Sequence, residues 1–376
     1  ATEDHDFQEI NHINLFGKKI AWDSKETGAV GSMSLDSFES VLVELKEVLG
    51  ETENAKKLVS LFENAYLKHK NLADATRFLV NELFGKFGLV IIDGDDKKLK
   101  QQFVPIIKKD VLQNGFVTAI KQNSKSLAKD YKVQAFVRDI NFFKLTKGNR
   151  VLIKGEISQK EIEENPENFS PNVLLRPLYQ ETILPNIAYI GGGAEVAYWM
   201  QLKTAFKQEN IPFPILVLRN SAMLIDDKQK QKIESLGFEI KDLFSAIDEL
   251  KKQYVLSNSK EDITLDVEKR ELKELYNKVH LKTNDKGLQA SINASHQKQL
   301  KSFEKLEQKL IRLEKQKHEN ALNTISKIKH QLLPKNCLQE RFDNFIPFYL
   351  KDGEKFIVML KDNFDPLDTN FVVLSY

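Results

Sequence analysis

Two short apolar runs on either side of a glycine turn and a helix-like stretch constrain the fold of this chain more than any other feature. Ile187 to Ile190 and Ile215 to Leu218 have the length and apolarity of strands, and Ala194 to Phe206 between them has a helical pattern. Strand, helix and strand in this order are typical of a βαβ unit, whose strands run parallel. The sequence therefore predicts an α/β fold around a parallel sheet.

The glycine turn of this unit is a candidate anion site. Gly191, Gly192 and Gly193 fall where the first strand ends and the helix begins. Backbone N–H groups and the helix dipole attract anions there, so we predict that these glycines bind a nucleotide or another anion. The alternative is that they only permit tight packing of strand and helix, and no Gly-Lys-Ser or Gly-Lys-Thr of a Walker loop follows them.

Three side chains in the first turns of the helix are candidate substrate contacts, namely Glu195, Tyr198 and Trp199. Tyrosine and tryptophan in a helix more often fill a core than stack on a ligand, but they also line pockets. Both interpretations therefore stay open for the two aromatic residues.

Two arginines at the edges of apolar runs, Arg176 and Arg219, are candidate ligands of a carboxylate or phosphate, with Gln180 and Ser221 close by in the sequence. A guanidinium binds either group through two parallel hydrogen bonds. Arg219 follows the second strand at its carboxyl end, which is the side of a parallel sheet where ligands bind. A surface ion pair is the alternative for both arginines.

Carboxylate and imidazole groups gather near the first residues, with Asp4, His5 and Asp6 in succession. Imidazole titrates near neutral pH and a carboxylate fixes its tautomer, so we predict that these residues perform acid–base catalysis or bind substrate. If the segment is helical, His5, Glu9 and His12 share one face and a divalent metal is an alternative, which we rank lower. A polar loop whose carboxylates cap a helix is the plainest alternative.

Charge and cysteine content narrow the function classes. The chain has 376 residues, with 56 basic and 54 acidic side chains, and this balance argues against a general binder of nucleic acid or membrane surfaces. Cys337 is the single cysteine, which excludes disulfide bonds within the chain and cysteine-rich zinc sites and fits a cytoplasmic protein. No apolar run has the length of a membrane span.

Helical patterns dominate the part of the chain after residue 245. Ala246 to Lys282 and Lys286 to Leu333 predict two long helices. Apolar or compatible residues of the second helix repeat at spacings of three and four, as in a coiled coil, and three gaps of four after Leu313 mark a stutter. This seam predicts pairing of subunits, and the lysine-rich surface leaves contact with RNA as an alternative. The seam residues are Phe303, Leu306, Leu310, Leu313, Lys317, Ala321, Ile325, Ile328 and Leu332.

Other apolar runs predict isolated strands. Leu89 to Ile92 should be a buried strand, and Phe238 to Ile240 a last core strand. The tail offers two β-rich runs, Phe356 to Leu360 and Phe371 to Leu374, and a hairpin is expected within residues 133–157.

Three stretches resemble one known family. They are ATEDHDFQEINH at the start, RPLYQETILPNIAYIGGGAEVAYWMQLK in the middle and PILVLRNSAMLID after it. With the long helices and the β-rich tail, they resemble the bacillithiol-synthesis cysteine-adding enzymes over nearly the whole chain. A TGQQ-type motif of that family's amino-terminal region is absent here, and the first residues read like the end of a buried strand. We therefore expect this sequence to be the downstream part of a longer protein.

The resemblance implies a Rossmann-like core with inserted connecting-peptide subdomains, as in class I aminoacyl-tRNA synthetases, and a homodimer formed through the coiled coil. It also implies a ligase that adds L-cysteine to glucosaminyl-malate, the last step of bacillithiol biosynthesis. Asp4, His5 and Asp6 would then lie at the mouth of the active site, with the glycine turn, Glu195 and Tyr198 in the second half of the cleft. Because a free carboxylate is a poor electrophile, we expect a nucleotide, ATP or ADP, to take part.

The expected division of the chain follows from these assignments. Residues 1–31 and 171–245 would form the two halves of the Rossmann-like core, and residues 32–170 an inserted helical and connecting-peptide region. Residues 246–335 would form the coiled coil, and residues 336–376 a β-rich tail that returns to the core. Two other function classes stay open, a synthetase-like protein that contacts RNA and a non-catalytic scaffold that binds a nucleotide.

Overall fold

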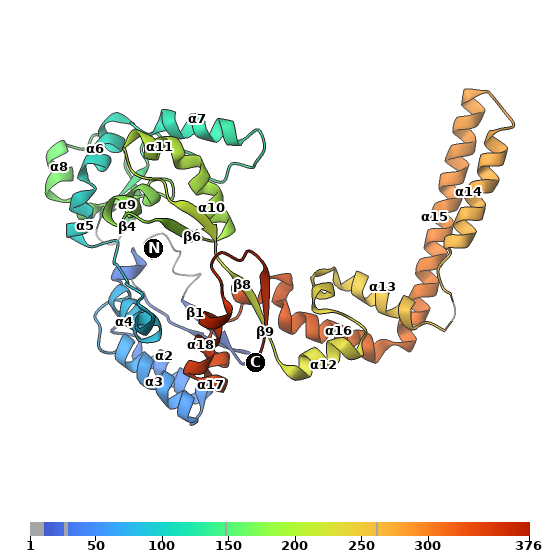
Figure 1. Ribbon diagram of the computed structural model, residues 1–376, viewed down its shortest axis with the longest axis horizontal. Helices are drawn as coiled ribbons and strands as arrows, with labels where there is room; N and C mark the ends of the chain where they lie inside the picture. The colour runs from blue at the N-terminus through green and yellow to red at the C-terminus, as the bar shows by residue number, and fades with distance from the viewer. Residues whose placement is uncertain (1–10, 26–28, 147–148, 261) are drawn as a thin grey trace. The chain divides into compact units, whose positions relative to one another are not determined.

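The computed structural model describes residues 11–25, 29–146, 149–260 and 262–376 (Figure 1). The chain divides into two compact units. The first comprises Ala1–Asn220 and Asn344–Asn370, and the second comprises Ser221–Asp343 and Phe371–Tyr376. The five-part division predicted from the sequence is based on sequence patterns and on the family resemblance, and it stays a prediction.

One part of the first unit is a group of helices beside a β-hairpin. The side chains of Thr52 and Asn71 cap α3 and α4, because they accept hydrogen bonds from the N–H groups of Ala55 and Asp74. Helix α3 also packs against α17, which comes from near the end of the chain. The elements of this part are β1 (His12–Leu15), β2 (Lys18–Ala21), α2 (Glu39–Leu49), α3 (Glu53–Tyr66), α4 (Leu72–Phe84), α17 (Ile346–Asp352) and α18 (Glu354–Asn363).

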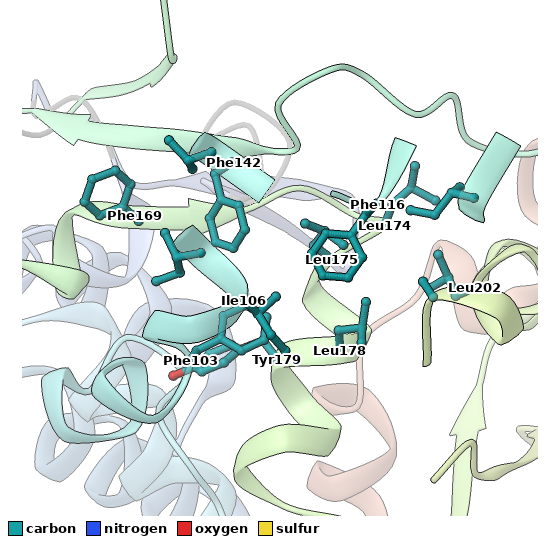
Figure 2. Close-up of a cluster of buried hydrophobic side chains, with 14 of the residues drawn as sticks. Phe103, Ile106, Phe116, Phe142, Phe169, Leu174, Leu175, Leu178, Tyr179 and Leu202 are labelled. Atoms are coloured by element: carbon teal, nitrogen blue, oxygen red, sulfur yellow. The ribbon is translucent and has the colours of Figure 1, made fainter. Parts of the chain in front are cut away.

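The other part of the first unit surrounds the apolar cluster shown in Figure 2. The ring centroids of Phe103 and Tyr179 lie 4.9 Å apart, and Leu174, Leu175 and Leu178 beside them are fully buried. These contacts fix α9 against the junction of α5 and α6 at Phe103. The elements are α5 (Lys97–Gln102), α6 (Val104–Gln113), α7 (Val117–Leu127), β3 (Phe142–Thr146), β4 (Asn149–Leu152), α8 (Gln159–Glu164), β5 (Phe169–Pro171), α9 (Arg176–Ile183), β6 (Ala188–Gly191), α10 (Gly193–Trp199), α11 (Lys203–Gln208) and β7 (Ile215–Leu218).

The predicted βαβ unit is present in this part. Strands β6 and β7 pair in parallel, with Gly191 opposite Leu218, and α10 and α11 connect them. Tyr189 faces α10, where its ring stacks on Trp199 with centroids 4.0 Å apart. The opposite face is open, because Ile190 and Ile215 are 54% and 65% exposed. The prediction of two parallel strands is therefore confirmed.

The second unit contains the long helices. Strand β8 (Ser221–Ile225) pairs in parallel with β9 (Phe371–Ser375), which confirms the second β-rich run of the tail. Helices α14 and α15 pack side by side as a helical hairpin (Figure 1). The helices are α12 (Asp227–Ser235), α13 (Ile247–Asn258), α14 (Asp266–His280), α15 (Lys286–Lys317) and α16 (Glu319–Leu332).

Both long helices predicted from the sequence are interrupted. The first divides into α13 and α14, and the second divides into α15 and α16 at His318, whose φ and ψ of −107° and 17° are not helical. The break at His318 falls within the predicted stutter of the seam. Beyond it, Ile325, Ile328 and Leu332 pack into the core of their own unit, whereas Leu310 and Leu313 on α15 are 39% and 61% exposed.

Three strand predictions are wrong. Leu89 to Ile92 forms neither helix nor strand, and Val90 is 78% exposed. Phe356 to Leu360 lies in α18, because Phe356 and Ile357 bury one helical face against α17. Residues 238–240 contribute to no strand. The hairpin within residues 133–157 is confirmed, since β3 pairs with β4 in antiparallel register.

None of the helices in the described part of the chain is both long and apolar enough to cross a membrane.

Candidate functional site

The glycine turn and Arg219 lie together at the carboxyl ends of β6 and β7. The ladder places them there, because the N–H group of Arg219 donates to the carbonyl oxygen of Gly191 over 2.9 Å. The Arg219 guanidinium carbon lies 3.7 Å from the position that a Cβ atom on Gly192 would take. The exposed guanidinium therefore sits beside the amino end of α10, where backbone N–H groups point outward.

The reason for a glycine differs among the three positions of the turn. A Cβ atom on Gly191 would lie 2.6 Å from Cε1 of Tyr189, so only glycine fits under that ring. A Cβ atom on Gly192 would make ordinary contacts at 3.4 Å or more. A Cβ atom on Gly193 would meet no atom of the described residues within 4 Å, and Gly193 is exposed. Packing therefore explains Gly191, whereas open space for a ligand is found at Gly193.

Glu195 caps the helix from inside the turn. One of its carboxylate oxygens accepts a hydrogen bond of 2.7 Å from the N–H group of Gly192, and the other accepts one of 3.2 Å from the hydroxyl of Tyr189. A carboxylate at this position stabilises a helix amino terminus. It also occupies the N–H group of Gly192, so an incoming anion has the N–H groups of Gly193 and Ala194 and the charge of Arg219 to bind.

Arg176 at the start of α9 is held by neutral groups. Its two terminal nitrogens donate to the hydroxyl of Tyr198 over 2.7 Å and to the side-chain oxygen of Gln180 over 3.2 Å. Burial acts to lower the pKa of Arg176, but the oxygens of Tyr198 and Tyr189 outweigh it and raise the pKa. Neither Arg176 nor Arg219 has an ion pair with a carboxylate within the described residues, so both positive charges are available to a ligand.

Two residues that the sequence did not single out complete this network. Tyr189 connects the Arg176 side to Glu195, and burial raises its pKa, so its hydroxyl keeps its proton at neutral pH. Glu181, which is 1% exposed, accepts a hydrogen bond of 3.0 Å from Gln180 and so orients the amide that holds Arg176. Strand alternation offers a signal for Tyr189, because it places Tyr189 on the same face as Gly191.

Trp199 and Ser221 are the two remaining predicted substrate contacts. Trp199 is fully buried in the apolar cluster, which corrects its prediction as a pocket residue, since a side chain without exposed surface offers nothing to a substrate. Ser221 belongs to the other compact unit, where its hydroxyl donates to Glu340 over 3.2 Å. Its role as a substrate contact stays a prediction.

The predicted acid–base residues Asp4, His5 and Asp6 lie outside the described residues, as does Glu9. His12 is described, and its Nδ1 atom lies 3.0 Å from the side-chain oxygen of Asn11. Across residues 11–25, 29–146, 149–260 and 262–376, no group of three or more histidine, cysteine, aspartate or glutamate side chains is placed to hold a metal ion.

The geometry defines a class of protein. A parallel strand pair ends in a glycine turn at a helix amino terminus, and two guanidinium groups without carboxylate partners accompany it among the described residues. This is a Rossmann-like α/β protein with a candidate site for small carboxylates or phosphates at the carboxyl ends of its strands.

Comparison with known families gives a more specific result. The family described as "Bacillithiol biosynthesis BshC, N-terminal Rossmann-like domain" matches residues 1–220, and "Bacillithiol biosynthesis BshC, C-terminal coiled-coil domain" matches residues 222–376. The chain therefore belongs to the BshC family. This membership confirms the predicted fold class and makes the chain an enzyme of the ligase class in bacillithiol biosynthesis.

Curated relatives carry the name "Putative cysteine ligase BshC". The relatives from Flavobacterium psychrophilum and Christiangramia forsetii are 41% and 40% identical, with 100% of this chain and 74% of each relative covered. A relative from Bacillus cereus strain B4264 is 25% identical, with 96% of this chain and 74% of the relative covered. The chain thus spans about three quarters of the length of these relatives.

Proposed function

We propose that this chain joins the carboxyl group of L-cysteine to the amino group of glucosaminyl-malate, the last step of bacillithiol biosynthesis. The observation that carries the proposal is the glycine turn with its two guanidinium groups. L-Cysteine carries one carboxylate, and the malyl group of the other substrate carries two. A site that offers uncompensated positive charge beside open backbone N–H groups suits such acids.

Arg219 and the open end of α10 are assigned to one carboxylate. The Arg219 guanidinium is exposed, and the N–H groups of Gly193 and Ala194 lie in the first turn of the helix, where they have no partner in the helix itself. An oxygen anion that reaches this turn would accept hydrogen bonds from both N–H groups. Glu195 keeps the turn in shape by accepting the hydrogen bond of the Gly192 N–H group.

Arg176 is assigned to a second anionic group. Its position is fixed by Tyr198 and Gln180, and Gln180 is itself held by Glu181. A guanidinium that is positioned in advance loses little conformational freedom when it binds, so it aligns a substrate at small entropic cost. Tyr189, whose hydroxyl keeps its proton, separates this cation from the carboxylate of Glu195.

The reaction also needs activation of the cysteine carboxyl group and removal of a proton from the attacking amine. A nucleotide would supply the activation by transferring a phosphoryl or nucleotidyl group to the cysteine carboxylate, which then carries the leaving oxygen. His5, with Asp4 or Asp6 to fix its tautomer, is the proposed acceptor of the amine proton. The amide C–N bond then forms as the bond between the activated carbonyl carbon and its leaving oxygen breaks.

The proposal includes a homodimer and a cytoplasmic location. Leu306, Leu310 and Leu313 form an exposed apolar row on α15, which supports pairing of two copies through this helix. Both proposed substrates are small polar metabolites, and the single cysteine of the chain fits a reducing compartment.

Thiol analysis in cells tests the proposal with the whole protein. Cells that lack its gene should accumulate glucosaminyl-malate and contain no bacillithiol, and the intact gene should restore the thiol. The gene with Arg219→Ala should fail to restore it, while Arg77→Ala, which removes an exposed arginine paired with Asp74, should restore it. Normal bacillithiol in Arg219→Ala cells with an equal protein level would remove Arg219 from the site. A normal thiol pool without the gene would reject the function itself.

A further inference from the structure

A cavity of the first unit lies beside the β1–β2 hairpin and not at the glycine turn. It has a volume of about 230 Å³, is partly open to solvent, and is lined by the β1–β2 hairpin, helices α2, α3 and α4, and the start of α17. It shares no residue with the network around Arg176 and Glu195. Aliphatic side chains such as Leu42, Leu45 and Leu72 make up much of its wall, so its interior is mainly apolar.

Aromatic rings form the rest of the wall. Among the described residues that line the cavity, five are aromatic, namely Trp22, Phe38, Phe62, Tyr66 and Phe345. Phe38 stacks on Tyr66 with centroids 4.3 Å apart, and Trp22 meets Phe38 edge to face at 5.3 Å. A planar aromatic ligand can pack favourably against the faces or the edges of such rings.

Tyr66 supplies the polar feature of the wall. Burial raises the pKa of its hydroxyl, and no hydrogen bond to that hydroxyl is found within the part of the chain that the structure describes. The side chain nevertheless keeps some accessible surface, which we attribute to the cavity because Tyr66 lines it. A hydroxyl on the cavity wall without a partner among the described residues offers a hydrogen bond to a ligand that carries one polar atom.

The volume limits the size of the ligand. An apolar cavity of about 150 Å³ in another protein holds one benzene molecule, so a cavity half as large again has room for one or two fused rings. The Trp22 indole N–H already donates to Ser37 over 2.8 Å and therefore needs no ligand atom. We propose that this cavity binds a small aromatic molecule of one or two rings that carries a single hydrogen-bonding group, which pairs with the Tyr66 hydroxyl.

Trp22 gives a direct test, because the chain has two tryptophans and the other, Trp199, can be replaced. The indole nitrogen of Trp199 makes no hydrogen bond within the described residues, so Trp199→Phe removes none and leaves Trp22 as the single reporter. Phenol and toluene are matched probes, since a hydroxyl in one replaces a methyl group in the other. Titration of the Trp199→Phe protein with either probe should give a saturable change in Trp22 fluorescence.

The ratio of the two affinities tests the role of Tyr66. One neutral hydrogen bond contributes about 1 kcal/mol, so phenol should bind about fivefold more tightly than toluene. Tyr66→Phe should abolish this preference while toluene still binds. An undiminished preference in Tyr66→Phe would overturn the assignment of Tyr66.

Filling the cavity tests its location. Val41→Phe on α2 and Leu79→Phe on α4 add a ring from two different walls, and either variant that keeps its circular dichroism melting curve should lose the binding of both probes. Val43→Phe is the matched control, because Val43 lies on the same helix as Val41, is 54% exposed and does not line the cavity. Absence of saturable binding in the Trp199→Phe protein, or equal binding in the filled and control variants, would overturn the proposal.

Discussion

Single glycine-to-alanine substitutions in the turn after β6 can distinguish a glycine required for packing from a glycine required for ligand access. In Gly191→Ala the new Cβ atom would lie 2.6 Å from Cε1 of Tyr189 and 3.3 Å from Cζ of the same ring. Carbon atoms in contact normally lie about 3.5–4.0 Å apart, so the ring has to move by about 1 Å. Gly193→Ala makes the same chemical change two residues later, where no described atom lies within 4 Å of the new methyl group.

The Tyr189 ring has little freedom to make that movement. It stacks on Trp199 with centroids 4.0 Å apart, Trp199 is fully buried, and the Tyr189 hydroxyl donates to Glu195 over 3.2 Å. Overpacking of this kind costs about 1–3 kcal/mol, and weakening of a hydrogen bond to a charged group adds about 1 kcal/mol or more. We expect Gly191→Ala to lower the free energy of unfolding by about 3 kcal/mol.

Gly193→Ala should have the opposite sign. Alanine is the better helix former by up to about 1 kcal/mol, so the free energy of unfolding should stay unchanged or rise slightly. Its methyl group stands at the open end of α10, so formation of bacillithiol should fall in this stable variant. Urea unfolding followed by circular dichroism measures both free energies. If Gly191→Ala lowers the free energy of unfolding by less than about 0.5 kcal/mol, the conclusion that the Tyr189 ring cannot move is wrong.

Three further predictions concern other parts of the chain. The double variant Leu310→Asp, Leu313→Asp should be monomeric in sedimentation, because the apolar row on α15 would no longer pair two copies. Its melting curve should not change, since both side chains are exposed. A surviving dimer would show that the copies associate through another surface. Burial raises the pKa of Asp110 to about 6, above its ordinary value of 3.8. The protonated carboxyl therefore stabilises the fold at low pH by on the order of 3 kcal/mol, and this stabilisation is lost as the pH rises through 6. Urea midpoints measured from pH 4 to 7 should fall accordingly, and Asp110→Asn should remove this pH dependence. Lys329→Met should cost about 1–3 kcal/mol in urea unfolding, because the buried ammonium donates to two backbone carbonyls; an unchanged midpoint would show that water replaces it.

Local signals in the sequence are sufficient for some elements and not for others. The βαβ unit is predictable because two apolar runs, a glycine turn and a helical stretch all agree within about 30 residues. Leu89 to Ile92 carries an equally strong local signal, but a strand also requires a neighbour, and within the described residues this run pairs with none. Phe356 to Leu360 is rich in strand-forming residues, yet packing of Phe356 and Ile357 against α17 decides for a helix.

The same limit applies to the site. The position of Arg219 follows from its place after a parallel strand, because strand direction fixes which end faces the ligand. The contact between Arg176 and Tyr198 depends on how α9 packs against α10, which no spacing in the sequence expresses. Trp199 is ambiguous for a related reason, since helical periodicity does not say which face of α10 is covered.

The course of the backbone has a practical consequence for work with separate fragments. A fragment that stops at residue 343 would contain β8 without β9, its parallel partner. One that runs from residue 222 to 376 would keep β9 and all of β8 except Ser221. It would also carry α17 and α18, and the partner of α17, helix α3, would be left behind. Cutting between the matched family segments therefore leaves a helical pair exposed to water. A clean separation requires residues 344–370 to be excised and the flanking ends to be rejoined by a linker.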